Sequence, residues 1–139
     1  MVIPTRRRIL IVDDEEDVSL VLKARLGSVG YDVQTERYGA TALNDVIQHP
    51  PDLILLDVKL PDLDGYEVCQ ELRRIYPNSR PVIVMFTVLE EPDDYARGFS
   101  NGADAYLVKG CEPNQLVKTI TQLLSADRTM LATANEMFA

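Results

Sequence analysis

Five short apolar segments, rich in β-branched residues, recur along the chain and alternate with stretches of helical periodicity. We predict strands near residues 8–13, 31–36, 52–57, 81–86 and 104–108. The third and fourth are apolar over nearly their whole length, which is typical of strands buried on both faces of a sheet. Such strands need helices on both sides, so the pattern constrains the chain to an α/β fold.

Helices are predicted near residues 15–28, 39–48, 65–76 and 93–100, and from Pro113 onward. Gly30 and the pair Pro50-Pro51 mark the ends of the first two helices. The apolar side chains expected to face the core recur mainly at spacings of three and four: Val18, Val21, Leu22, Leu26 and Val29; Leu43, Val46 and Ile47; Val68, Leu72 and Ile75; Leu116, Ile120, Leu123 and Leu124.

The connections between strands decide the topology. Parallel strands joined by helices need right-handed crossovers, which leave helices on both faces of the sheet. A glycine-rich turn after the first strand would indicate a dinucleotide site, but the turn here is acidic (residues 13–17) and would repel a pyrophosphate. We therefore predict a doubly wound, flavodoxin-like α/β domain with a five-stranded parallel sheet in the order 2-1-3-4-5.

Length and charge exclude several classes of protein. The chain has 139 residues, enough for one domain, and a net charge of -8, which argues against a nucleic-acid-binding surface. Cys69 and Cys111 are too far apart in sequence for a zinc site and are interpreted as reduced thiols. Because no apolar run approaches the ~18 residues of a membrane span, we expect a cytoplasmic protein without membrane contact.

Charged residues lie at the carboxyl ends of three of the predicted strands. They are the pair Asp13-Asp14, Asp57 and Lys109. Because the carboxyl ends of parallel strands meet at one edge of a sheet, we expect a site there for a divalent cation and a phosphoryl group. Helix capping is the alternative explanation for the acids; it accounts for residues 15–17, but not for Asp57 or Lys109.

Motifs in a fixed order give the chain a family resemblance. They are Asp13-Asp14; Asp57 with the sequence Leu-Pro-Asp-Leu-Asp-Gly at 60–65; Thr87; and Gly-Ala-Asp-Ala-Tyr-Leu-Val-Lys at 102–109. With this order and spacing, the chain from about residue 7 to residue 125 resembles the receiver domain of two-component response regulators. The known strand order of that family also supports the predicted sheet.

The resemblance implies a role for each strand-end residue. Asp57 would accept a phosphoryl group from a phosphohistidine of a sensor histidine kinase or phosphotransfer protein. Mg²⁺ would be held by Asp13, Asp14, Asp57 and the carbonyl of Lys59. Lys109, the Thr87 hydroxyl and the Val88 amide would contact phosphoryl oxygens.

The resemblance also implies a switch. Taken alone, Thr87 suits a turn and Tyr106 suits a half-buried strand. In a receiver domain, Thr87 moves toward the phosphoryl group, and Tyr106 follows and reshapes the face of the fourth helix, fifth strand and fifth helix. Such a domain catalyses only its own phosphorylation and dephosphorylation. His49, beside two prolines, is expected to be solvated and has no such role.

Two positions depart from the family pattern. Gly110 follows Lys109, where the family usually has a proline after a cis bond. A non-proline cis bond costs about 3–4 kcal/mol, so we expect a trans bond, a mobile loop at 110–112 and a Lys109 that is less firmly placed. Val88 replaces a small residue, and its extra methyl groups would slow the access of water and small phosphodonors.

Other functions for the same fold make different demands. A phosphorylation-independent pseudo-receiver usually lacks one of the acids or the lysine, and all are present here. An aspartyl-phosphate phosphatase of the haloacid dehalogenase type needs an acid two residues after its nucleophile, where this chain has Lys59. A flavodoxin-like FMN binder needs a Ser/Thr/Gly-rich loop after the first strand.

The C-terminal end is not needed by the receiver pattern. We divide the chain into a receiver domain at 1–125 and a helical extension or linker at 126–139. A heptad-like spacing joins Leu116, Ile120, Leu123, Asp127, Met130, Ala134 and Met137. We expect this extension to pack against a second chain, giving a homodimer, or against an output domain; a frayed helix end is the alternative.

Overall fold

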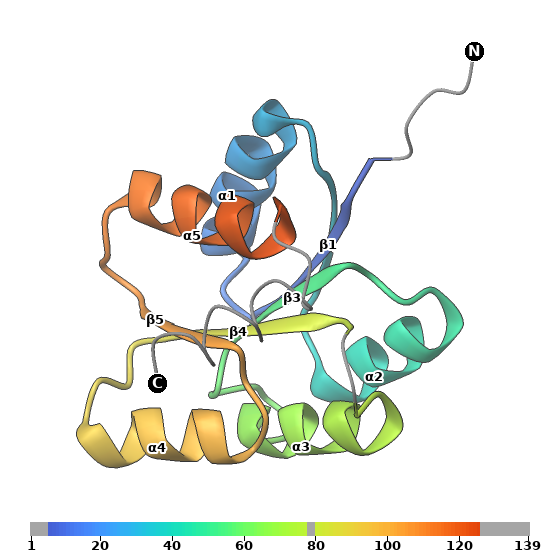
Figure 1. Ribbon diagram of the computed structural model, residues 1–139, viewed down its shortest axis with the longest axis vertical. Coiled ribbons are helices and arrows are strands. Elements are labelled where there is room, and N and C mark those ends of the chain that lie inside the picture. Colours follow the sequence, from blue (N-terminus) through green and yellow to red (C-terminus); the bar gives the residue numbers. More distant parts are fainter. Residues whose placement is uncertain (1–5, 78–79, 126–139) are drawn as a thin grey trace, which may run out of the picture.

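The computed structural model describes residues 6–77 and 80–125, in which strands and helices alternate (Figure 1). The strands are β1 (Arg8–Val12), β2 (Asp32–Glu36), β3 (Leu53–Leu56), β4 (Val82–Thr87) and β5 (Ala105–Val108). The helices are α1 (Glu16–Val29), α2 (Gly39–Gln48), α3 (Gly65–Ile75), α4 (Pro92–Ser100) and α5 (Pro113–Ser125). Each predicted element is present, and no predicted bound differs from the observed one by more than one residue.

The sheet has the predicted topology. Its five strands are parallel and lie in the order β2-β1-β3-β4-β5. Val12 pairs with Leu56, the last residue of the neighbouring strand, so β1 and β3 end at the same level. This register brings the residues that follow the two strands side by side, as the sequence predicted.

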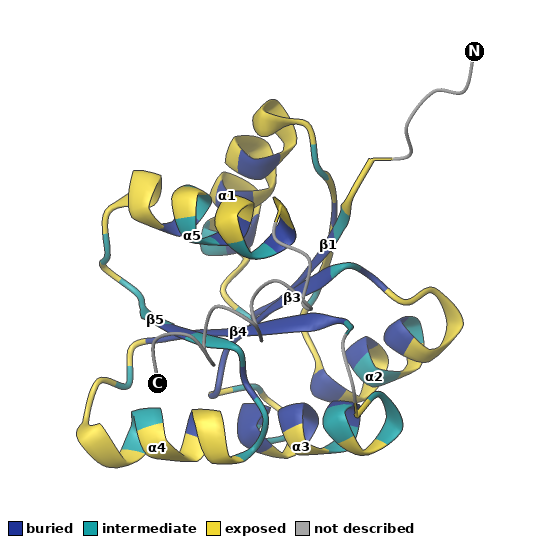
Figure 2. Ribbon diagram, in the orientation of Figure 1, coloured by how far each residue is buried: buried dark blue, intermediate teal, exposed yellow. Residues whose placement is uncertain are grey.

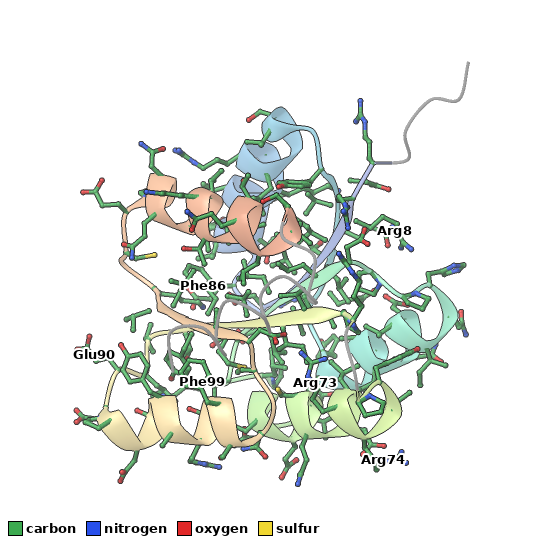
Figure 3. The ribbon with its side chains drawn as sticks, in the orientation of Figure 1. Arg8, Arg73, Arg74, Phe86, Glu90 and Phe99 are labelled. Atoms are coloured by element: carbon green, nitrogen blue, oxygen red, sulfur yellow. The ribbon has the colours of Figure 1, made fainter. Side chains whose placement is uncertain are left out.

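Helices cover both faces of the sheet. In Figure 1, α1 and α5 lie on one face and α2, α3 and α4 lie on the other. Successive strand residues alternate between the two layers, as pleated strands must. Ile9, Ile11 and Phe86 pack toward α1 and α5, whereas Leu10, Val12 and Met85 pack toward the other three helices. Figure 3 shows Phe86 on the α1 and α5 side of the sheet.

The buried faces of α1 and α2 are narrower than the sequence pattern predicted. Val21, Val29 and Ile47 were expected in the core, but they are 61%, 49% and 54% exposed. Val21 and Ile47 directly neighbour the buried Leu22 and Val46, and one step along a helix turns a side chain by about 100°. Val29 lies at the end of α1, beyond its last buried residue. Figure 2 shows how much of α1 faces solvent.

Two further sequence predictions concern the C-terminal extension and His49. The heptad-like extension at 126–139 lies outside the described residues. His49 is exposed, as expected for a helix end beside prolines.

Within the part of the chain that the structure describes, no helix is long and apolar enough to span a membrane.

Candidate functional site

The predicted site residues converge at the carboxyl edge of the sheet. The Asp57 N–H donates to the carbonyl of Val12 (2.9 Å), which holds the start of the β3–α3 loop against the end of β1. On the other side, the Lys109 N–H donates to the carbonyl of Thr87 (2.7 Å). Backbone pairing of adjacent parallel strands thus positions residues that are far apart in sequence.

Three carboxylates form an acidic cluster at this edge. Asp13, Asp14 and Asp57 each offer an oxygen that lies within 4.8 Å of the others. Asp13 and Asp57 are only 3% and 5% exposed, so their charges are poorly solvated. Oxygen ligands at this spacing match the preference of a hard divalent cation, and the donor set therefore fits Mg²⁺.

Lys59 lies beside the cluster rather than inside it. Its side chain is exposed, and its backbone N–H is 3.4 Å from Oδ1 of Asp57. The predicted role of its carbonyl as a metal ligand stays a prediction.

Lys109 supplies the positive charge of the site. Its Nζ is 2.8 Å from Oδ2 of Asp13 and 2.9 Å from Oδ2 of Asp57, and its side chain is 10% exposed. Burial acts to lower the pKa of Lys109, but the carboxylates outweigh this effect and hold the pKa above its ordinary value. Lys109 is therefore a permanent cation beside Asp57.

For the pKa of Asp13, burial outweighs the effect of its favourable contacts. Burial raises the pKa of Asp13, and the charge of Asp57 adds to this increase. The Lys109 ammonium and the Glu15 N–H, which donates to Oδ1 at 2.9 Å, lower it only in part. Burial thus disfavours the ionised form of Asp13, and a divalent cation bound beside it would stabilise that form.

Glu15 is a site residue that the sequence analysis missed. It was assigned to helix capping, and it does occupy the N-cap position of α1, but its side chain makes no capping hydrogen bond. Instead, Oε1 lies 2.8 Å from Nζ of Lys109. The capping explanation still suits Glu16 and Asp17, which lie in the first helical turn. Only the fold could show that Lys109, 94 positions further on, lies within reach of Glu15.

Thr87 and Tyr106 meet through the backbone of Leu89. Thr87 is fully buried, and its Oγ1 is 3.4 Å from the Leu89 N–H. The Tyr106 hydroxyl donates to the Leu89 carbonyl (2.9 Å) and lies 3.4 Å from the hydroxyl of Tyr66. Tyr106 is 8% exposed, so its ring is packed inside the domain. A movement of the 88–91 loop would be felt by both residues.

The loop after Lys109 differs in part from its prediction. The Lys109–Gly110 bond is trans, as expected, and Gly110 has φ +107°, a backbone conformation that favours glycine. We expected Lys109 to be less firmly placed, but its ammonium is held by carboxylates on several sides. The predicted mobility of the loop remains a prediction. Val88 is 55% exposed next to the buried Thr87.

Comparison with known proteins gives the family. Residues 9–121 match the family model described as "Response regulator receiver domain". A Guillardia theta protein named "Probable transcriptional regulator ycf27" is 42% identical over 120 residues, which cover 86% of this chain and 46% of the relative. A Synechocystis protein named "DNA-binding dual master transcriptional regulator RpaA" is 38% identical, with 84% of this chain and 48% of the relative covered. This chain therefore spans about half the length of these curated relatives.

The solved structures agree with the family match. The crystal structure of a CheY-like response regulator receiver domain protein from Methanospirillum hungatei is similar, with a TM-score of 0.81 and 29% identity. The match covers 87% of this chain and 95% of that one. This chain belongs to the response regulator receiver domain family, and it is a receiver domain of a two-component response regulator.

Proposed function

We propose that Asp57 accepts a phosphoryl group from a phosphohistidine of a sensor histidine kinase or phosphotransfer protein. A carboxylate oxygen of Asp57 attacks phosphorus, the N–P bond to the imidazole breaks, and an acyl phosphate forms on Asp57. The observation that carries this proposal is the position of Asp57. Its buried carboxylate belongs to the acidic cluster and lies 2.9 Å from the ammonium of Lys109.

The residues around Asp57 would offset the negative charge of the phosphoryl group, either directly or through a bound metal ion. Asp13, Asp14 and Asp57, with the carbonyl of Lys59, would hold Mg²⁺, which when bound offsets the charge of the incoming phosphoryl group. Lys109 would donate to one phosphoryl oxygen. The Thr87 hydroxyl and the Val88 N–H would donate to another.

The domain would report phosphorylation through Thr87 and Tyr106. When the Thr87 hydroxyl turns toward the phosphoryl group, the 88–91 loop would move with it. The hydrogen bond from Tyr106 to Leu89 would then break, and the Tyr106 ring would take a new position. The face formed by α4, β5 and α5 would change with it. This domain would thus act on no substrate other than its own aspartate.

The output of the switch would lie outside the receiver domain. The similar proteins from Guillardia and Synechocystis bear names of transcriptional regulators and are about twice as long as the matched region. We propose that phosphorylation of this domain controls a transcription-regulating region. A homodimer through the α4-β5-α5 face or through residues 126–139 would be the transmitting form.

The experiment is phosphorylation by acetyl phosphate with Mg²⁺, followed by intact-mass measurement. The wild type should gain one phosphoryl group, and Asp57→Asn should gain none, because an amide is a poor nucleophile. Glu16→Gln, which removes an exposed acid of α1, serves as the control and should be phosphorylated like the wild type. Stoichiometric phosphorylation of Asp57→Asn would rule out Asp57 as the acceptor.

Two other outcomes would favour the alternatives. A folded wild type that takes up no phosphoryl group under these conditions would indicate a pseudo-receiver. Steady release of phosphate from a simple phosphomonoester would indicate an aspartyl-phosphate phosphatase.

A further inference from the structure

The ammonium of Lys109 is surrounded by carboxylates. Within residues 6–77 and 80–125, its Nζ contacts Asp13, Glu15 and Asp57 at 2.8, 2.8 and 2.9 Å. A lysine ammonium has three N–H donors and no acceptor. Each donor therefore has a carboxylate partner. A phosphoryl oxygen on Asp57 can reach Lys109 only if one of these partners gives up its place.

The three partners differ in how easily they can leave. The Asp13 and Asp57 side chains are 2% and 6% exposed, whereas that of Glu15 is 55% exposed. A buried carboxylate that loses its cation remains desolvated, which is costly for Asp13, and for Asp57 until its carboxylate has become an acyl phosphate. Glu15 can turn into water, and an ion pair with an exposed partner contributes little. Of the three contacts, the one with Glu15 is therefore the easiest to break.

The position of Glu15 indicates that its side chain has a role other than helix capping. Glu15 stands at the start of α1, where an acidic residue can stabilise the helix by capping, yet its carboxylate is turned to Lys109 instead. Its own N–H donates to Oδ1 of Asp13, which fixes the backbone of Glu15 beside the cluster. The side chain is thus held within reach of Lys109 and remains free to swing away.

We propose that Glu15 is a displaceable partner of Lys109, which competes with the phosphoryl group for the ammonium and so slows the phosphorylation of Asp57. This inference rests on the function proposed above. Glu15 acts through Lys109 and is a positioning residue, since no step of the transfer requires contact between Glu15 and phosphorus. Its carboxylate must leave Lys109 before the ammonium can stabilise charge on the transferring group.

The test compares three variants at saturating Mg²⁺. Glu15→Gln keeps the size of the side chain and removes its charge. Glu15→Asp keeps the charge but is one methylene shorter, which breaks the contact with Lys109. Glu16→Gln removes an equal charge one residue away and leaves that contact intact.

Two quantities are measured for each variant. They are the rate of phosphorylation by acetyl phosphate and the affinity for beryllofluoride, a phosphoryl analogue that binds without group transfer. Competition by contact predicts that both Glu15 variants react faster and bind beryllofluoride more tightly, by roughly 2–5-fold, the range expected for one partly exposed ion pair. Glu16→Gln should match the wild type in both.

The outcomes separate the possible failures. If Glu15→Gln is faster but Glu15→Asp behaves like the wild type, the effect is one of overall charge and the proposal is wrong. If both Glu15 variants react at the wild-type rate or more slowly, while their melting temperatures are unchanged, the proposal is also wrong. A wild type that takes up neither the phosphoryl group nor beryllofluoride overturns the proposed function itself.

Discussion

The ring of Tyr106 in β5 lies directly against Gly98 in α4. A Cβ atom at position 98 would come within 2.8 Å of Cδ2 of Tyr106 and 3.1 Å of Cε2. Tyr95, one turn earlier on α4, also packs against this ring, with a distance of 4.4 Å between the two ring centroids. The inward position of Tyr106 therefore depends on the absence of a side chain at residue 98. Gly98 makes room for one of the two states of the proposed switch.

We predict that Gly98→Ala displaces Tyr106. Overpacking costs about 1–3 kcal/mol, and the gain in helix propensity from glycine to alanine returns about 1 kcal/mol. The free energy of unfolding should therefore fall by roughly 1 kcal/mol, measured by urea denaturation. In a Tyr106→Ala background the clash is absent, so the same substitution should stabilise the protein. An equal effect of Gly98→Ala in both backgrounds would contradict this account.

A second prediction concerns the charge of Asp13. Its pKa is raised by burial, so ionisation of Asp13 opposes folding: the stability that the neutral acid gives is complete below the ordinary pKa and is lost as the pH rises through the raised value. At pH 7, Asp13→Asn should raise the melting temperature of the metal-free protein by a few degrees. Asparagine also keeps an oxygen to accept the Glu15 N–H.

The same variant tests the acidic cluster as a metal site. Mg²⁺ should raise the melting temperature of the wild type, because a ligand of the native state stabilises it, and should do so less in Asp13→Asn. The difference between the two metal-free proteins should shrink as the pH falls through the raised pKa of Asp13, because the carboxyl then becomes neutral. A destabilised Asp13→Asn at neutral pH would mean that its ion pair with Lys109 outweighs the cost of burial.

The sequence was sufficient for the fold and for most of the site, for a physical reason. Apolar strands buried on both faces, such as β3 and β4, leave little choice but a parallel sheet, and the residues that follow such strands must meet at one edge. The sequence alone therefore places Asp13, Asp57 and Lys109 together. Contacts that depend on the reach of a side chain could not. The pairing of Glu15 with Lys109 and the packing of Tyr106 on Gly98 both join elements whose spacing only the folded chain defines.

Helix faces show the same limit. The spacing of apolar residues predicts which side of a helix is buried, but not how wide the covered strip is. Val21 and Ile47 fit the apolar pattern and yet are exposed, because the fully buried residues of α1 and α2 fall on one narrow line along each helix. Their exposure could not be read from residue type.

A third prediction concerns Arg73, which ties α3 to the far end of the sheet. Its Nε donates to the Gly102 carbonyl (2.8 Å), its Nη1 to the Pro81 carbonyl (2.9 Å), and its Nη2 to Asp104. Lysine cannot satisfy three acceptors with this planar geometry. Arg73→Lys should therefore lower the free energy of unfolding by about 1–3 kcal/mol.

Arg74 provides the matched control for this substitution. It is the next residue on α3, pairs with Glu71 on the helix surface, and has a side chain that is 68% exposed. Figure 3 shows Arg73 turned toward the sheet and Arg74 turned away from it. Arg74→Lys should change the free energy of unfolding by less than about 0.5 kcal/mol. Similar losses for both variants, compared by urea denaturation, would contradict the role assigned to the Arg73 contacts.

The last prediction concerns the two thiols. Cys69 is fully buried in α3 with its Sγ 3.3 Å from the carbonyl of Asn101, and burial raises its pKa to about 11. Cys111 lies in the loop before α5 and is partly exposed; burial raises its pKa as well. Because the thiolate is the reactive form, Cys111 should be alkylated first by iodoacetamide at pH 8. Cys69 should react only as the domain unfolds, at a rate that increases with urea. Intact-mass measurement of Cys69→Ala and Cys111→Ala assigns each modification, and equal rates for the two thiols in the folded protein would contradict the burial of Cys69.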